Sequence, residues 1–395
     1  MRRLTSVPLV VLLVAACGND APKEPGPSGS VETAPQQALG RGIAWLRSQA
    51  REGKWSDVRG PSTGFTAIAL APVVAALPAD QRGADPLVRS AAAYLLAKQR
   101  DDGAIADDAF LGYENYLTSA TLMALTILDD PAQKAERNRM RGYLTTLQRA
   151  DEGRHAGGFG YNKRKGADLS NAQYTLEALR AAGIPPDHDV MRKAIAYLEK
   201  VQNRSENEAN QNAVWHIEID GEQINVVPGN DGSAGYEPGV SKAGWDRLPD
   251  GTFVARGYGS MTYALLKCYI LTGLEADDAR VQAVLDWLGK HYTWDENPGF
   301  RKLVEQQPER KDAPFFGLYY YYMTAAKALR LADITTVTTP TGPRDWRKDL
   351  TIALLKRQRE DGSWLNSQSP RWEEGHPVLA TAFATIALQD ILARK

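Results

Sequence analysis

The chain has 395 residues and a formal net charge of −1, from 47 Lys and Arg against 48 Asp and Glu. No basic block stands out, so we do not expect a nucleic-acid partner. The two cysteines are Cys17, near the amino terminus, and Cys268, in an apolar helical run. We expect Cys268 to be a buried small hydrophobe and no intrachain disulfide to form if Cys17 is modified.

The first residues have the pattern of an export signal. Arg2 and Arg3 precede an apolar stretch that ends at Ala16 and is shorter than the roughly 20 residues that span a bilayer. The sequence Val-Ala-Ala-Cys ending at Cys17 resembles the lipobox of bacterial lipoproteins. This resemblance implies cleavage after residue 16 and lipidation of Cys17, with attachment to the outer membrane or facing the periplasm. An ordinary signal peptide followed by a chance cysteine is the alternative.

Residues 17–36 are rich in Pro, Gly, Ser and Glu, which is typical of a disordered tether. The remainder, 37–395, is expected to form one domain because a single pattern recurs through it. Five units carry a glutamine at the same point of the pattern: Gln49, Gln99, Gln148, Gln202 and Gln358. A sixth, equivalent unit lacks the glutamine and ends at Phe300. The predicted repeats are about 37–80, 86–130, 136–184, 187–274, 278–333 and 344–392, a period typical of helical arrays.

Each repeat divides into two predicted helices. The first is amphipathic, with Val281, Val284 and Leu288 spaced for one helix face. The second is apolar on most faces, as in Ser260–Gly273, and therefore has to be covered on all sides. We predict an all-α fold in which six outer–inner pairs close into an α/α toroid, with an open solenoid as the alternative. The expected starts of inner helices are marked by the N-caps Asn115, Ser170 and Ser260 and by Pro377.

The repeat resembles that of squalene cyclases and protein prenyltransferase β-subunits, the prenyltransferase/squalene oxidase repeat. Its signature is aromatic-Leu-x-x-x-Gln, a short gap, and then Gly-x-aromatic. Trp45–Trp55 and Leu354–Trp364 are the best copies, and the match covers about 37–392. The glycine allows the tight turn that leaves the first helix, and the glutamine amide can bond turn carbonyls and a neighbouring unit. The resemblance thus implies the toroidal fold more than a reaction.

The known chemistries of these families do not transfer to this sequence. Squalene-type cyclases hold their acid in Asp-x-Asp-Asp, and the nearest string here, Glu275–Asp278, follows an inner helix rather than preceding one. Protein prenyltransferases bind zinc through Asp, Cys and His, but the corresponding region offers Asp312 without a cysteine. We therefore expect no metal, no cofactor and no prenyltransferase α-subunit, and the sequence assigns no catalytic residue.

Candidate ligand-binding residues were sought where inner helices begin, because we expect those ends to face the mouth of the toroid. Tyrosine and polar groups there suit a pocket with an apolar body and hydroxyl tips. Since successive helical residues turn by about 100°, Tyr319 and Tyr322 can share a face while Tyr320 and Tyr321 pack elsewhere. Tyrosines that only fill the core are the alternative. The candidates are Glu114, Tyr116, Asn171, Tyr174, Tyr258, Ser260, Tyr263, Tyr319, Tyr322, Trp372 and His376.

An insertion at 203–257 interrupts the repeat. Its segment Trp215–Val227 alternates around Asp220-Gly221, which predicts a β-hairpin with a two-residue turn. A long ordered insertion of this kind commonly forms a lid, and we expect it to cover the lumen.

Three functions remain open from the sequence. The first is binding of a small, partly apolar, isoprenoid-like ligand, which would be favoured by an open apolar lumen. The second is a polysaccharide-active, lyase-like enzyme using His376 with a tyrosine and Arg371, which needs a wide groove with stacked aromatics. The third is a non-catalytic envelope scaffold, which would be favoured by a lumen filled with side chains.

Overall fold

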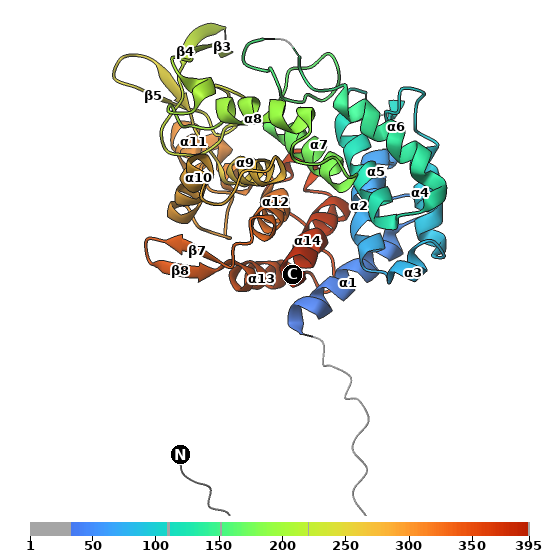
Figure 1. Cartoon of the computed structure of the whole chain (residues 1–395). Helices are drawn as coiled ribbons and strands as arrows, with labels where there is room; N and C mark the ends of the chain where they lie inside the picture. The colour runs from blue at the N-terminus through green and yellow to red at the C-terminus, as the bar shows by residue number, and fades with distance from the viewer. Residues whose placement is uncertain (1–32, 109–110, 151, 220, 394–395) are drawn as a thin grey trace, which may run out of the picture. The chain divides into compact units, whose positions relative to one another are not determined.

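The computed structural model describes residues 33–108, 111–150, 152–219 and 221–393 (Figure 1). The predicted signal peptide at 1–16, Cys17 and most of the tether at 17–36 lie outside these ranges. Contacts along the chain gather Ala34–Lys395 into one compact unit. Among the described helices, none has both the length and the apolar character needed to cross a membrane.

Helices that are apolar on most faces form a closed inner ring. Each packs against the next along the chain, and the last packs against the first. In α9, for example, nearly every residue from Gly259 to Tyr269 is buried. This closure confirms the predicted all-α toroid and excludes the open solenoid. Within the described residues the six inner helices are α2 (Thr63–Ala75), α5 (Glu114–Leu128), α7 (Leu169–Ala181), α9 (Gly259–Leu271), α12 (Leu318–Leu331) and α14 (Pro377–Leu392).

Amphipathic helices form an outer layer around this ring. In α10, Val281, Val284 and Leu288 are buried against the inner layer, as their spacing predicts. The outer helices are α1 (Ala34–Gln49), α4 (Pro86–Leu96), α6 (Lys134–Thr145), α8 (Asp189–Val201), α10 (Ala279–Lys290) and α13 (Trp346–Arg357). Short elements connect them: α3 (Ala79–Arg82), α11 (Arg301–Gln306), the hairpins β1 (Ser56–Asp57)–β2 (Gly60–Pro61) and β7 (Thr336–Thr339)–β8 (Gly342–Asp345), and 3₁₀ turns at Pro131–Gln133, Glu208–Asn210, Pro308–Arg310, Ala313–Phe315 and Arg371–Glu373.

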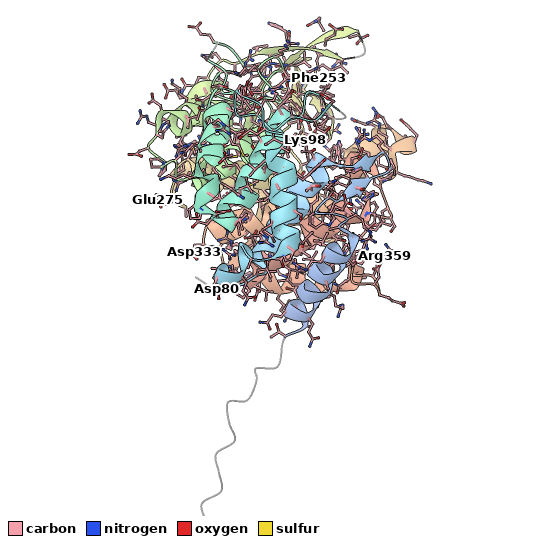
Figure 2. The ribbon with its side chains drawn as sticks, turned by 90° about the vertical axis from the view of Figure 1, so that its right-hand side faces the viewer. Asp80, Lys98, Phe253, Glu275, Asp333 and Arg359 are labelled. Atoms are coloured by element: carbon pink, nitrogen blue, oxygen red, sulfur yellow. The ribbon has the colours of Figure 1, made fainter. Side chains whose placement is uncertain are left out.

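The inner helices share one direction, so the toroid has two distinct ends. Asp80, Glu275 and Asp333 follow α2, α9 and α12, and they lie toward the lower left of Figure 2. Lys98, Phe253 and Arg359, which precede inner helices, lie farther to the right in the same view. We call these the carboxyl end and the amino end of the toroid.

The repeated glutamines join neighbouring outer helices. Gln148 Nε2 donates to Gly157 O in its own turn (3.0 Å) and to Val190 O at the start of α8 (2.8 Å). The same two bonds are made by Gln99, Gln202 and Gln358. The Gln358 amide reaches Ala38 O in α1, so this contact also joins the last outer helix to the first. Gln49 departs from the pattern, because its amide donates to Ser48 Oγ instead.

The insertion forms a four-stranded sheet of order β3-β4-β6-β5 with its own small core of Ile217, Val226 and Ala255. The strands are β3 (Trp215–Ile219), β4 (Glu222–Val226), β5 (Trp245–Arg247) and β6 (Phe253–Ala255). Ile219 pairs with Glu222 across β3 and β4, which confirms the hairpin and its two-residue turn. The segment packs at the amino end of the toroid, where Tyr236 O accepts from Leu169 N (2.9 Å) at the start of α7.

The N-caps of three helices lie two residues before the predicted N-caps. The residues at the N-cap positions are Tyr113, Asp168 and Tyr258, so Asn115, Ser170 and Ser260 lie within the first turns. Tertiary partners explain the difference: Ser260 N, for instance, donates to Asn297 Oδ1 from a different segment (3.0 Å). Pro377 is at the first position of α14, as predicted. Cys268 is buried, also as predicted, and burial raises the pKa of its thiol to about 12.

Candidate functional site

A cavity of about 420 Å³ lies between the inner helices, toward the carboxyl end of the toroid. All of the inner helices in the described chain contribute to its wall. Most of the lining is apolar, because the helices expose alanine, isoleucine and methionine side chains there. The apolar lining consists of Ala67, Ile68, Ala71, Pro72, Ala75, Ala120, Met123, Ile127, Ala181, Met323, Ile386 and Ala393, beside Tyr174 and Gln389.

Charged side chains from four inner helices form a connected chain in the same wall. Lys267 Nζ of α9 lies 2.6 Å from Glu177 Oε2 of α7, and Lys327 Nζ of α12 lies 3.4 Å from Glu177 Oε1. Lys327 Nζ is also 3.4 Å from Asp390 Oδ1 of α14, which accepts from Arg330 Nε at 2.6 Å. We call these five residues the lumen charge cluster.

The lysines keep the lumen carboxylate of Glu177 ionised. Burial alone would raise the pKa of Glu177, but Lys267 and Lys327 outweigh that effect and hold it at about 2. In turn, burial would lower the pKa of Lys327, but Asp390 and Glu177 raise it. At neutral pH Glu177 is therefore an ionised carboxylate and not a carboxylic acid.

Toward the amino end, the space above the cavity is filled by hydrogen-bonded hydroxyl groups. Tyr116 OH donates to Ser170 Oγ (2.6 Å), which shares a hydrogen bond with Tyr320 OH (2.7 Å). Gln173 Nε2 also donates to Tyr320 OH. The Tyr320 ring stacks on Tyr174 with centroids 6.4 Å apart. Burial raises the pKa of Tyr116, Tyr174 and Tyr320 well above the usual tyrosine range.

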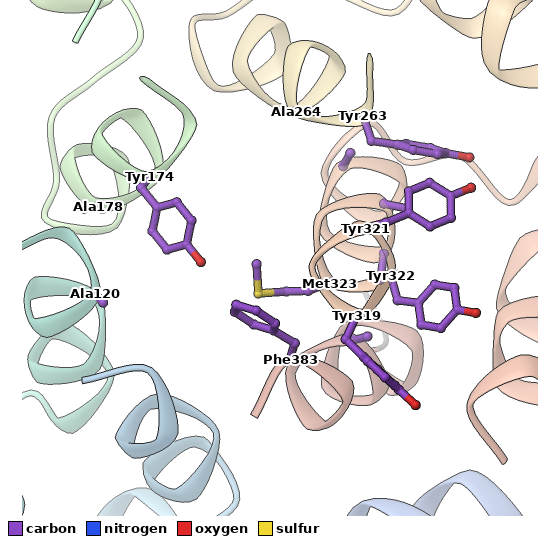
Figure 3. Packing of buried hydrophobic residues seen from close by; sticks show 14 of the residues in the cluster. Ala120, Tyr174, Ala178, Tyr263, Ala264, Tyr319, Tyr321, Tyr322, Met323 and Phe383 are labelled. Carbon is purple, nitrogen blue, oxygen red and sulfur yellow. The ribbon is translucent and has the colours of Figure 1, made fainter. Parts of the chain in front are cut away.

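Of the sequence candidates, Tyr174 lies in the cavity wall, and Tyr116 and Asn171 lie near it at the amino end. Figure 3 shows the Tyr174 side chain pointing between the inner helices together with Met323 and Phe383. Asn171 Nδ2 donates to Asp168 Oδ2 (2.7 Å) beside the tyrosine network. Burial raises the pKa of Asp168 to about 7.

A second group of candidates packs away from the lumen. Tyr263, Tyr319 and Tyr322 point outward from α9 and α12 in Figure 3. The rings of Tyr319 and Tyr322 lie 5.8 Å apart, so these residues do share a face, but that face is directed away from the cavity. Tyr258 packs on Phe300 (4.9 Å), and Ser260 Oγ accepts from Asn297 Nδ2 (3.2 Å).

The remaining candidates are separate from both groups. Glu114 lies at the start of α5, near Arg100 and Asn162. Trp372 is 41% exposed, and its ring packs on Phe316. His376 is the N-cap of α14, and its ring packs on Phe65 with centroids 4.8 Å apart. Over the described ranges, no group of three or more His, Cys, Asp or Glu side chains is placed to hold a metal ion.

The sequence reading missed the lumen charge cluster. Lys267 and Asp390 are the single charged residues of α9 and α14, and Lys267 stands in the string Leu-Leu-Lys-Cys-Tyr. An isolated charge on a helix that is buried all round has to be paired, and that signal could have identified Glu177, Lys267, Lys327 and Asp390. Tyr320 was missed because the rotation of α12 decides which of its four consecutive tyrosines faces the lumen, and the sequence does not give that rotation.

Comparisons with known proteins agree with this architecture. Residues 88–202 match the family model of the squalene-hopene cyclase N-terminal domain. A structure of a variant of the type II terpene cyclase MstE from Scytonema, with its product merosterolic acid A, has a TM-score of 0.50 and 13% identity over 90% of this chain and 96% of that chain. Another MstE structure, with the substrate geranylgeranyl dihydroxybenzoate, has a TM-score of 0.49 and 13% identity over 90% and 97%. A search of curated proteins gives no significant match.

Proposed function

Because the chain is squalene cyclase-like in its family-model match and its fold, we propose that the lumen binds a small, partly apolar, isoprenoid-like molecule. The observation that carries this proposal is the cavity of about 420 Å³ with apolar walls between the inner helices. Its volume is within the roughly 300–1,000 Å³ typical of small-molecule sites. The type II terpene cyclase MstE, which has a similar fold, holds the terpene cyclase product merosterolic acid A.

The shape of the lumen favours this function over the two alternatives. A scaffold needs no internal space, whereas this chain has a largely apolar cavity of about 420 Å³ between its inner helices. A polysaccharide-active site would need His376 beside a tyrosine, but the His376 ring lies against Phe65. An apolar small molecule is the occupant that matches the lining.

Binding is favoured over a cyclase reaction started by a proton. Such a reaction needs a carboxylic acid that still carries its proton beside the alkene. In this cavity Glu177 has a pKa of about 2, and Asp390 accepts from Arg330. We therefore propose a carrier or receptor for the ligand rather than a squalene-type cyclase.

We further propose that lipid groups on Cys17 anchor the protein to a bacterial membrane, facing the periplasm or in the outer membrane. The support is the lipobox-like sequence that ends at Cys17. Mass spectrometry of the amino-terminal peptide from the native host should find acyl groups on Cys17, and Cys17→Ser should release the protein from the membrane fraction. An unmodified Cys17 in the membrane-bound protein would overturn this proposal.

The lumen proposal can be tested by filling the cavity. Ala71→Trp and Ile68→Trp place an indole in the void, whereas Ala132→Trp adds the same ring at an exposed position. Each variant would be titrated with geranylgeraniol and the complex detected by native mass spectrometry, with circular dichroism to verify folding. We expect one ligand per chain for the wild type and Ala132→Trp, and loss of binding in both cavity variants. Unchanged binding by folded cavity variants would overturn the proposal.

A further inference from the structure

The lumen charge cluster has an excess positive charge. Lys267, Lys327 and Arg330 supply three cations, whereas Glu177 and Asp390 supply two carboxylates. All five residues line the cavity, so the excess lies in a wall that is otherwise apolar. A ligand that fills the cavity would remove water from the uncompensated cation, which is costly unless the ligand carries the opposite charge.

Arg330 is placed to receive this counterion. Its Nε donates to Asp390 Oδ1 at 2.6 Å, which fixes the orientation of the guanidinium. No described residue bonds its two terminal amino groups, and its side chain remains 31% exposed at the carboxyl end of the cavity. The two terminal amino groups form a planar fork that matches the two oxygens of a carboxylate.

Asp390 gives a second, independent sign that a polar group belongs here. The residue is only 5% exposed, yet within the described chain its Oδ2 is buried without a hydrogen-bond partner. Buried carboxylate oxygens are nearly always hydrogen-bonded. A hydroxyl beside the ligand's anionic group, from the ligand or from a water molecule, would supply the missing donor.

We infer that the lumen ligand is an apolar monoanion, whose carboxylate binds the Arg330 guanidinium while its hydrocarbon body extends between Met123, Met323 and Tyr174. This inference rests on the proposed function and specifies the ligand's head group. A neutral ligand would leave the single positive charge of the cluster uncompensated. A doubly negative head group would give the cluster and ligand together a net negative charge. A cationic head group would increase their net positive charge.

The test compares two probes that share one C20 isoprenoid body: geranylgeranoic acid, with a carboxylate, and geranylgeraniol, with a hydroxyl. Palmitic acid is the third probe, because it has the same head on a straight chain. Dissociation constants would be measured by competition with a fluorescent apolar probe for the wild type, Arg330→Gln and Arg330→Lys. Arg89→Gln removes an exposed arginine of α4 and is the matched control.

We expect geranylgeranoic acid to bind at least about tenfold more tightly than the alcohol, the scale of one charge-assisted hydrogen bond. Arg330→Gln should abolish this preference without weakening the alcohol, Arg330→Lys should retain part of it, and Arg89→Gln should retain all of it. Palmitic acid binding as tightly as geranylgeranoic acid would support the carboxylate head and reject an isoprenoid body. Equal binding of acid and alcohol, unchanged in Arg330→Gln, would overturn this inference and leave the proposed function standing. Binding of none of the probes would overturn both.

Discussion

Lys267 of α9 and Glu177 of α7 form an ion pair of 2.6 Å in the wall of the cavity, with the Lys267 side chain only 2% exposed. The Lys267 ammonium also lies 5.9 Å from the centroid of the Tyr174 ring. The pair therefore links two neighbouring inner helices through a charge that water hardly reaches. It also brings a cation directly to the one sequence candidate that lines the cavity.

Breaking this pair from one side should be strongly destabilising. Lys267→Met leaves Glu177 with Lys327 alone, and loss of one partner of a buried pair typically costs about 3–5 kcal/mol. The double variant Lys267→Met/Glu177→Leu removes both charges and should lose less than the sum of the two single variants, by at least about 1 kcal/mol. Guanidinium unfolding of the four proteins measures this coupling, and strictly additive losses would contradict it.

Removing a repeat glutamine should cost more where the amide joins two outer helices. Gln148→Ala leaves the Gly157 and Val190 carbonyls without a side-chain donor, and we expect a loss of about 1–3 kcal/mol in unfolding free energy. Gln49→Ala is a control from the same point of the repeat, since its amide bonds only Ser48 Oγ. That variant should remain within about 0.5 kcal/mol of the wild type. Equal losses would show that the shared glutamine bonds do not stabilise the toroid.

The turn glycine should be needed for a close contact as well as for its backbone angle. At Gly103, with φ of +91°, an added Cβ would lie 2.2 Å from Arg139 O in α6. Gly183 has a similar φ of +87° but open space around it. Gly183→Ala should therefore cost about 1 kcal/mol, the price of a left-handed backbone, and Gly103→Ala clearly more. Thermal unfolding compares the two, and matching losses would exclude the steric contribution.

The sequence predicted the layers of the toroid well because the features that determine them are local and recur in each repeat. A helix that is apolar all round has to be an inner helix wherever it occurs. The repeated glutamine bonds the neighbouring outer helix in the same way at Gln99, Gln148, Gln202 and Gln358. The closure of the ring by α14 on α2 was not fixed by these rules, because an open solenoid stacks the same units, and it is the structure that excludes the solenoid. None of this requires knowledge of a particular ligand.

The site was harder to predict because it depends on helix rotation and on which end of the toroid is filled. The candidates were taken from the amino end, where Tyr116, Ser170 and Tyr320 bond one another above the cavity. The cavity wall is built instead from residues one to three turns later, such as Glu177 and Lys327. Those charges were visible in the sequence, but their pairing across α7, α9, α12 and α14 is a property of the closed ring. Contact between the candidate tyrosines and a ligand stays a prediction.

Asp168, the N-cap of α7, should make the protein less stable as the pH rises. Burial raises its pKa to about 7 although Asn171 donates two hydrogen bonds to it, so the folded state keeps a proton that the unfolded state has already lost. The stabilisation is complete below the usual pKa of 3.8 and is lost as the pH rises through 7. Asp168→Asn preserves a good cap and removes the titration, so its stability relative to the wild type should improve by about 2 kcal/mol between pH 5 and pH 8.

The cap of α4, Asp85, is the control. Burial would raise the pKa of Asp85, but Val88 N–H and Arg47 hold it below 3.8. Asp85→Asn should therefore differ from the wild type by the same amount at both pH values. Parallel pH profiles for the wild type and Asp168→Asn in urea unfolding would show that Asp168 is ionised in the folded protein.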